Sequence, residues 1–488
     1  MESLSLDTLV DDSNYALGGE SSQRAREENQ AILAELERRK RTRTLAVPTD
    51  DGRVRARLRE IGEPVTLFGE RAPDRRERLK YVMSQIQLAR GGDLAIPDVS
   101  EEGSSDEEEE EFYTPGTPAL LEARQRIAEF SLPRARRRIQ RQKVEAHTPL
   151  ARLIDLRRLV VSDLKRFGQL GSQIADERPI SHVRFSPDGQ KAATGSWSGG
   201  VRLWNIPSCT KERQYHGHSD RVGGVAWHPK ATLTQSPSVV NLASGGADKA
   251  ILLWTLASEI PIARLEGHQD RVVRVAFHPS GQYLGSASFD GTWRLWDCAS
   301  ETELLVQEGH SKEVFAVEFQ DDGALAASGG LDGIGRVWDL RTGRTAMVLD
   351  GHAQAIFGID FSPNGYQIAT GSGDDTIRIW DMRSLKSAYV IPAHTSTVSD
   401  VRFFRHRLSD DLAPVATLST NDQIPNEGLY LASSGYDGLV KLWAADDWQL
   451  ARTLSTDAGR VMSVDISPDG MYMLSGSSNR SIQLYGRE

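Results

Sequence analysis

Cysteine is nearly absent from this sequence. Cys209 and Cys298 are the two cysteines among 488 residues, they lie far apart, and they form no CxxC pair. We therefore expect neither a disulfide framework nor a zinc site, and no motif calls for a cofactor. Long apolar runs are missing as well, since no stretch reaches about 18 apolar residues. The segment MESLSLDTLVDD also lacks the basic and then apolar layout of a signal peptide. We expect an intracellular protein.

Charge is unevenly distributed along the chain. The formal net charge of −10 argues against a protein that coats nucleic acid uniformly. The segment from Arg124 to Arg166 nevertheless contains thirteen Lys and Arg against four Asp and Glu, and it follows the acidic tract EEGSSDEEEEE at 101–111. The chain therefore combines segments of opposite charge, and its average composition hides this organisation.

The C-terminal two thirds of the chain is built from repeats. The segments GHQDRVVRVAFHPSGQYLGSASFDGTWRLWD and GHAQAIFGIDFSPNGYQIATGSGDDTIRIWD are two of several that align along their whole length. Trp296, Trp338 and Trp380 end successive units 42 residues apart, and equivalent positions define seven units. Each unit is typical of short strands of alternating apolar residues, separated by Pro-Asx-Gly or Asp-Gly turns.

These units resemble the WD40 repeat family, from about Phe167 to the C-terminus. The resemblance implies an all-β fold, a seven-bladed β-propeller with four strands in each blade. The last unit has sequence for only three strands, so we predict that Phe167–Ile174 supplies the fourth and closes the ring. Two insertions, 230–241 and 405–428, fall between the first and second strands of their units. They should lie on the face opposite the Gly-His loops.

A His, an Asp, a Ser or Thr and a Trp recur at fixed places in the units. A catalytic triad occurs once in an enzyme, whereas a set that recurs five times indicates a hydrogen-bond network holding each blade together. We therefore assign these side chains a structural role. The His, Asp and Trp members are His218, Asp248, Trp254, His268, Asp290, Trp296, His310, Asp332, Trp338, His352, Asp374, Trp380, His394, Asp437 and Trp443.

Aromatic residues and arginines occupy turn positions on one rim of the predicted ring. They are Trp197, Phe289, Tyr436, Arg221, Arg271 and Arg460. Such side chains are enriched at protein interfaces, so we predict that the rim binds a protein partner; ordinary surface residues are the alternative. From Pro179 onward the acidic residues outnumber the basic ones, 35 to 27, which favours a protein over RNA as the ligand of the propeller.

The stretch LREIGEPVTLFGE places apolar residues in strongly charged surroundings. Val54, Leu58 and Ile61 fall at helical spacing before a Gly-Glu-Pro break, and a second helix is predicted with Asp74 as its N-cap. A unit of this size buries too little apolar surface to be stable alone, so it should pack on the propeller or on a partner. The residues predicted to bind a partner are Ile61, Val65, Leu67 and Phe68.

In its wider context, VRARLREIGEPVTLFGERAPDRRERLKYVM, this stretch resembles the splicing-factor motif of WD-repeat pre-mRNA-processing factors of the U4/U6 small nuclear ribonucleoprotein (snRNP). The resemblance implies a non-catalytic scaffold subunit of the U4/U6 snRNP and the U4/U6·U5 tri-snRNP. Such a subunit acts in spliceosome assembly and pre-mRNA splicing in the nucleus. The resemblance also implies contact with the splicing-factor subunit that grips the U4/U6 duplex and, in some lineages, with a cyclophilin.

A basic helical region precedes the propeller. Thr117 and Pro118 are typical of a helix start, and the segment PRARRRIQRQK follows. On a helix these basic side chains point in most directions, which suits phosphate contact better than pairing within the chain. We predict contact with U4/U6 snRNA or its proteins; a solvated connector is the alternative, and nothing indicates base-specific readout. The predicted contact residues are Arg134, Arg136, Arg137, Arg138, Arg141 and Lys143.

The chain thus divides into five predicted segments. These are an arm that is mostly disordered or helical at 1–49, the splicing-factor motif at 50–88, an acidic linker at 89–116, the basic helical region at 117–166 and the propeller at 167–488. Two rival functions are a WD40 substrate receptor of a ubiquitin ligase and an enzyme with a His/Asp pair in the central channel. Neither of them explains the splicing-factor motif.

Overall fold

The computed structural model describes residues 51–65, 72–89, 116–147, 149–405, 428–445, 447–455 and 459–487. The chain separates into two compact units, Met1–Glu111 and Phe112–Glu488. The predicted arm at 1–49, the acidic tract and most of the insertion at 405–428 lie outside the described residues. No helix of the described ranges is long and apolar enough to cross a membrane.

The first unit contains two helices, α2 (Asp51–Ile61) and α3 (Ala72–Ala89). Val54, Leu58 and Leu79 are almost fully buried between them, with Ile61 packed against this small core. The predicted helical spacing is therefore confirmed for α2. The predicted N-cap of α3 is wrong, because the helix begins at Ala72 and Asp74 lies in its first turn, where a carboxylate favours the positive end of the helix dipole.

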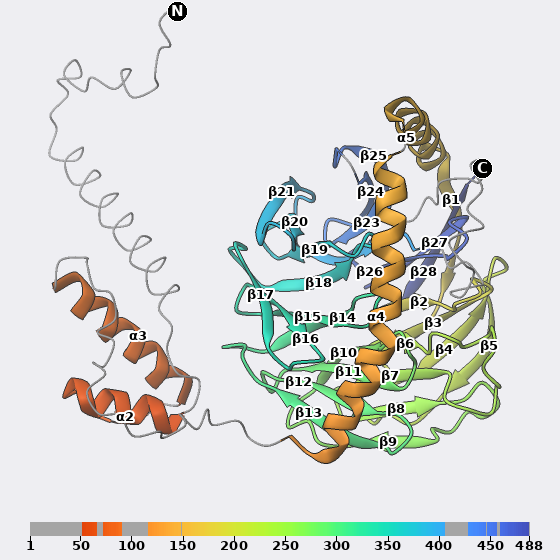
Figure 1. Cartoon of the computed structure of the whole chain (residues 1–488). Coiled ribbons are helices and arrows are strands. Elements are labelled where there is room, and N and C mark those ends of the chain that lie inside the picture. Colours follow the sequence, from red (N-terminus) through yellow and green to blue (C-terminus); the bar gives the residue numbers. More distant parts are fainter. Residues whose placement is uncertain are drawn as a thin grey trace, which may run out of the picture. The chain divides into compact units, whose positions relative to one another are not determined.

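Seven four-stranded antiparallel sheets form a β-propeller, as the repeats predict (Figure 1). The first three blades are β2 (Ile180–Phe185), β3 (Lys191–Ser196), β4 (Val201–Asn205) and β5 (Thr210–Tyr215); β6 (Val222–Trp227), β7 (Leu242–Gly246), β8 (Ile251–Trp254) and β9 (Ala263–Leu265); and β10 (Val272–Phe277), β11 (Tyr283–Ser288), β12 (Trp293–Asp297) and β13 (Thr302–Gln307). The next three blades are β14 (Val314–Phe319), β15 (Leu325–Gly330), β16 (Ile334–Asp339) and β17 (Thr345–Asp350); β18 (Ile356–Phe361), β19 (Gln367–Ser372), β20 (Thr376–Asp381) and β21 (Lys386–Pro392); and β22 (Val398–Phe403), β23 (Tyr430–Gly435), β24 (Leu439–Ala444) and β25 (Leu450–Ser455).

The seventh blade closes the ring with strands from both ends of the propeller. It contains β26 (Val461–Ile466), β27 (Tyr472–Ser477), β28 (Ser481–Arg487) and β1 (Phe167–Ile174). β1 pairs with β28 from Phe167 opposite Arg487 to Ile174 opposite Ser481. The predicted strand exchange is thus confirmed, and it leaves no gap in the ring at which an inner strand edge is open.

The first strands of the seven blades lie side by side around the axis of the ring. Each of them carries one extra residue in its pairing with the second strand, a β-bulge at the same position in every blade. The bulged residues are Ser181, Gly223, Val273, Phe315, Phe357, Ser399 and Met462. A bulge turns the side chain of the extra residue out of the regular alternation of its strand. The seven bulges therefore reorient the chain at seven equivalent positions around one end of the axis of the ring.

A repeated hydrogen-bond chain links the strands within five blades. In the third blade, His268 Nδ1 lies 2.7 Å from Asp290 Oδ2, and His268 Nε2 lies 2.7 Å from Ser286 Oγ. Trp296 Nε1 donates to the same hydroxyl at 2.8 Å. Burial alone raises the pKa of Asp290, but hydrogen bonds from His268 and Thr292 outweigh burial, and the pKa falls below its usual range. The structure places all fifteen predicted network residues in such chains.

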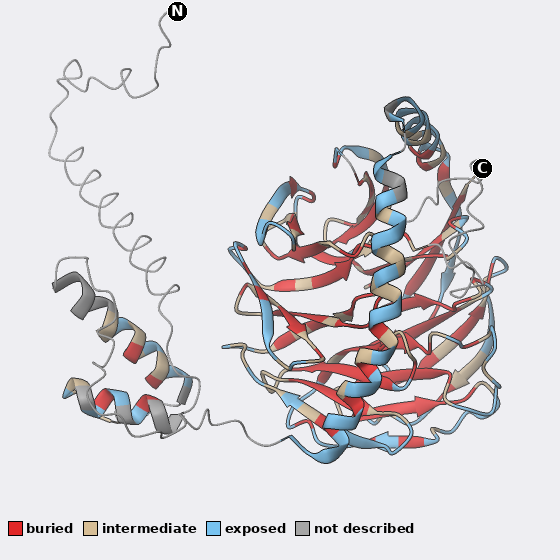
Figure 2. Cartoon of the chain, viewed as in Figure 1, coloured by how far each residue is buried: buried red, intermediate tan, exposed pale blue. Residues whose placement is uncertain are grey.

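Two helices precede the propeller strands in the second unit. α4 (Pro118–Ala146) runs across the face that carries the turns between first and second strands, and α5 (Leu150–Lys165) leads into β1 (Figure 1). Leu120 N donates to Thr117 Oγ1 at 3.3 Å, so the predicted helix start is confirmed. Ala123 and Ile127 are buried against the third and fourth blades, whereas much of the opposite side of α4 is exposed (Figure 2). α4 is therefore part of the propeller unit.

Candidate protein-binding site

A pocket lies on the axis of the propeller, where the seven bulges meet. Its volume is about 260 Å³. We call it the axial pocket. It is lined by Ser181, Trp197, Arg221, Val222, Gly223, Ala247, Arg271, Val272, Val273, Arg274, Phe289, Phe315, Phe357, Ser399, Tyr436 and Met462. All seven bulged residues are among them, so the backbone irregularities of the inner strands shape the pocket.

The predicted rim residues gather at this pocket in pairs. The guanidinium carbon of Arg271 lies 3.8 Å from the ring centre of Phe289. Arg221 covers Trp197 in the same way at 5.0 Å. Arg460 stands beside the lining and lies 5.6 Å from the ring of Tyr436. The structure therefore brings together all six residues that the sequence placed on the rim.

Three further residues of the pocket were missed by the sequence reasoning. Phe315 and Phe357 meet edge to face with ring centres 4.9 Å apart, and Arg274 lies 5.7 Å from the ring of Phe315. The two phenylalanines stand five residues after His310 and His352, so the repeat spacing contained a signal for them. The spacing alone does not assign them to a pocket, because an aromatic residue inside a strand is more often part of the core.

Arg274 is the most buried arginine of the pocket lining. The residue as a whole is 7% exposed. Burial lowers the pKa of Arg274 to about 10, and the charges of Arg184 and Arg402 act in the same direction, while the carboxylate of Asp400 opposes them. Within the described part of the chain, the Arg274 guanidinium makes no hydrogen bond and no ion pair. A cation on a buried residue, without an ion pair among the described residues, therefore faces the pocket.

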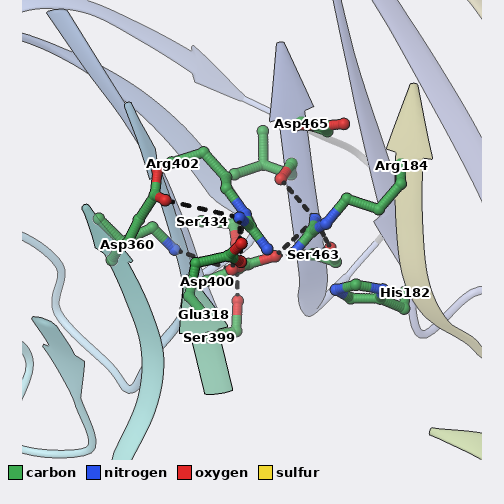
Figure 3. Close-up of polar contacts among 12 residues, drawn as sticks. His182, Arg184, Glu318, Asp360, Ser399, Asp400, Arg402, Ser434, Ser463 and Asp465 are labelled. Carbon is green, nitrogen blue, oxygen red and sulfur yellow. Dashed lines mark hydrogen bonds and ion pairs between the residues drawn. The ribbon is translucent and has the colours of Figure 1, made fainter. Parts of the chain in front are cut away.

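A charged cluster occupies the channel between the inner strands (Figure 3). Arg402 Nη1 lies 2.6 Å from Glu318 Oε2 and 3.6 Å from Asp360 Oδ1. Arg184 Nη1 lies 3.2 Å from Asp400 Oδ2. These pairs join the first, fourth, fifth and sixth blades across the channel. Burial raises the pKa of Asp360 to about 6, although the charges of Arg405 and Arg402 act in the opposite direction.

The channel contains one histidine among these groups, His182. Val225 N donates to His182 Nδ1 at 3.1 Å, and burial keeps the pKa of His182 well below its usual value. His182 therefore bonds to backbone and not to a carboxylate. The His/Asp pair that the enzymatic alternative requires is not formed by this histidine. Within the described ranges, no group of His, Cys, Asp and Glu side chains is arranged to hold a metal ion.

The predicted RNA-contact residues lie on α4, and their environments differ. Arg138 Nε lies 2.6 Å from Asp322 Oδ2, and Arg134 lies over the ring of Phe130 with its guanidinium carbon 4.0 Å from the ring centre. The expectation that these residues avoid pairing within the chain is therefore wrong for Arg138, because the helix packs on a blade that supplies a carboxylate. Residues with exposed side chains are Arg136, Arg141 and Lys143, whereas Arg137 is half-buried.

The predicted partner-binding residues of the splicing-factor motif are only partly described. Ile61 packs on the core between α2 and α3, so much of its side chain is used within the motif. Val65 is half-buried, and its carbonyl accepts a hydrogen bond from Arg78. Leu67 and Phe68 lie outside the described residues. Partner binding by this elbow remains a prediction.

The repeats of the propeller match a known family model. The model of the WD domain, G-beta repeat, matches seven segments, 169–205, 209–255, 259–297, 301–339, 343–381, 385–444 and 448–486. These segments cover more than half of the chain. The chain belongs to the WD-repeat family.

A second family model and several relatives add to the WD-repeat assignment. The model described as pre-mRNA processing factor 4 (PRP4) like matches residues 54–82. The U4/U6 small nuclear ribonucleoprotein Prp4 of Mus musculus is 41% identical over 211 residues, 43% of this chain and 40% of its own length. The protein of that name from Homo sapiens is 41% identical over 206 residues, and that from Saccharomyces cerevisiae is 33% identical over 191 residues; each match covers 40% of the relative. The matched region thus spans about two fifths of the length of these relatives.

Proposed function

We propose that this protein is a non-catalytic scaffold subunit of the U4/U6 snRNP and of the U4/U6·U5 tri-snRNP, and that it acts in spliceosome assembly in the nucleus. The observation that carries the proposal is the match of residues 54–82 to the PRP4-like model, in the same chain as seven WD repeats. Relatives that are 41% identical over about two fifths of this chain are named as U4/U6 snRNP proteins. The ubiquitin-ligase alternative receives no support from them.

The mechanism we propose is docking at several separate surfaces. The axial pocket binds a protein subunit of the particle, because its paired arginines and aromatic rings have the composition of interaction hot spots. The splicing-factor motif binds a second site on the particle. Partners that suit these surfaces are the subunit that grips the U4/U6 duplex and, in some lineages, a cyclophilin. Linked contacts of moderate strength raise the overall affinity without a catalytic site.

The basic residues of α4 supply a third contact in this proposal. Arg136, Arg141 and Lys143 are exposed along the C-terminal half of the helix, on a unit whose propeller is acidic overall. Such a local cluster attracts phosphate groups, and its contribution to binding falls with salt. We propose that it lies against U4/U6 snRNA or an RNA-bound protein.

Depletion of the protein from nuclear extract, followed by addition of purified variants, tests the proposed function. The wild-type chain should restore the amount of U4/U6·U5 particle and the splicing of a reporter pre-mRNA. Leu58→Asp should not, because Leu58 is fully buried in the small core of the motif. Glu77→Gln, on the exposed side of α3, is the matched control and should restore both. Normal particle levels in depleted extract would refute the proposal.

A further inference from the structure

We propose that the axial pocket receives an acidic side chain of an extended segment of a partner protein, with the carboxylate seated on Arg274 and an adjacent apolar side chain on the Phe315 and Phe357 rings. This inference deepens the proposed function, because it assigns the chemistry of the partner that the propeller binds. It is argued from the burial and pairing of the arginines and from the shape of the pocket.

The first argument is the state of Arg274. Arg274 is 7% exposed as a residue, so its charge has lost part of its hydration, and burial of a charge costs free energy unless an ion pair or hydrogen bonds replace the water. The other buried arginines of the channel have such partners, as Arg184 pairs with Asp400 and Arg402 with Glu318. Arg274 has none among the described residues. A carboxylate that enters the pocket would supply the missing partner and form two parallel hydrogen bonds with the planar guanidinium.

The second argument is the charge around the pocket. Arg221, Arg271 and Arg460 surround it in addition to Arg274, and each lies against an aromatic ring of the chain. A ring beneath the guanidinium holds its plane in place and leaves the N–H groups at its edge available to a ligand. The surrounding potential is therefore complementary to a segment with several carboxylates, which also accelerates its association.

The third argument concerns the class of the ligand. Single-stranded RNA binds such sites by stacking its bases on exposed aromatic faces. Here Trp197, Phe289 and Tyr436 each already have an arginine of the same chain over the ring, and Phe315 faces Phe357 edge to face. One face of each of the first three rings is thus already covered within the chain. A protein segment needs only the N–H edges of the arginines and apolar contact with the rings. The pocket provides both.

The test places the photoreactive amino acid p-benzoylphenylalanine at Phe357 in the full chain, in nuclear extract. Phe357 lines the pocket and has no arginine over its ring among the described residues. After irradiation, mass spectrometry identifies the crosslinked molecule. We expect a peptide with an Asp or Glu within a few residues of the crosslink. Crosslinking to RNA, to a peptide without nearby acidic residues, or to nothing in an intact particle would overturn the inference.

Variants of Arg274 in the same chain separate binding from a structural role. Arg274→Met should lower the crosslink yield at least about tenfold, since it removes the partner of a desolvated carboxylate. It should leave the thermal unfolding midpoint unchanged or raise it, because an unpaired buried charge is replaced by an apolar side chain. Arg274→Lys should retain part of the yield. A lower unfolding midpoint together with an unchanged yield would show that Arg274 only supports the fold, and would overturn the inference.

The matched control is Arg383→Met. Arg383 lies 3.6 Å from the ring centre of Tyr366, so it forms a comparable arginine–aromatic pair, but neither residue lines the axial pocket. Its crosslink yield should equal that of the wild-type pocket. U4 and U6 RNA are measured in the same samples. Absence of both RNAs with an acidic peptide still crosslinked would refute the proposed function and keep the inference; the reverse result would refute only the inference.

Discussion

Arg138 on α4 and Asp322 in the fourth blade form an ion pair, with Nε and Oδ2 2.6 Å apart. The side chain of Asp322 is 8% exposed, so the pair is largely shielded from water. Together with the hydrogen bond from Gln142 Nε2 to the carbonyl oxygen of Asn364, it attaches the basic half of α4 to the ring. The helix that carries the proposed RNA contact is thereby held at a fixed place on the propeller.

Removing that ion pair should loosen α4. Arg138→Gln leaves a shielded carboxylate without its partner, and we expect a loss of about 1–3 kcal/mol in the free energy of unfolding. Faster amide hydrogen exchange in α4 should accompany it, measured by mass spectrometry. Arg158→Gln on α5 is the control, because the Arg158–Asp155 pair is exposed and such pairs contribute little. Equal exchange in the wild type and Arg138→Gln would contradict the attachment.

Closure of the ring should depend on the side chain of Phe167. It is 1% exposed at the start of β1 and packs with the sixth and seventh blades. Phe167→Ala should lower the free energy of unfolding by about 3–5 kcal/mol, measured by urea denaturation. Leu170→Ala changes the same strand where the side chain is 48% exposed, and it should cost about 1 kcal/mol or less. Similar losses for both variants would argue against a specific role of Phe167.

Acidification should weaken the fold through His278. Burial lowers the pKa of His278 to about 4, from an ordinary value of 6.5. The unfolded chain therefore binds the proton first as the pH falls. The contribution of neutral His278 to the free energy of unfolding is complete above pH 6.5 and is lost as the pH falls toward 4. The loss amounts to about 3 kcal/mol at most.

The measurement for His278 is the free energy of unfolding between pH 7 and pH 4.5, in the wild type and in His278→Gln. Asp360 has a raised pKa and acts in the opposite direction over part of this range, but it is common to both proteins and cancels in their difference. The difference between the two proteins should shrink as the pH falls. A difference that does not depend on pH would show that His278 does not titrate in this way.

RNA association through α4 should be sensitive to salt. Reversing Arg136 and Lys143 to Glu should weaken binding to a labelled U4/U6 duplex, and the slope of log affinity against log salt should fall by about 1–2. Arg138 is left in place because it holds the helix. Lys211→Glu, an exposed change on β5, is the control and should alter neither value. If retention of the double variant equals that of the wild type at every salt concentration, α4 does not contact the RNA.

The sequence predicted the repeated features of the fold well, because each was visible several times. A period of 42 residues located the blades, and the shortage of one strand in the last unit predicted the exchange of β1. The rim arginines and aromatics could be found because turn residues at one offset must lie on one face of a propeller. Five of the six proved to line a single pocket, with Arg460 beside it.

Features that depend on single, distant contacts could not be predicted. Asp322 lies 184 residues from Arg138, and no local pattern indicates that they meet. Phe315 and Phe357 reach the pocket because a bulge interrupts the alternation of side chains along their strands. The regular alternation of an ideal strand would not predict this orientation. Whether Arg274 has an ion-pair partner depends on which of the other blades supply carboxylates to the channel. Each of these three features depends on how the closed ring brings distant residues together, and not on the sequence of any one segment.

The most direct test of the central claim is native affinity purification of the tagged full-length chain from nuclear extract, with quantification of its bound small nuclear RNAs. The account predicts that U4 and U6 RNA are enriched together, in near-equal amounts, over unrelated small nuclear RNAs, along with proteins of the same particle. Recovery of the folded chain with neither U4 nor U6 RNA above the untagged background would contradict it.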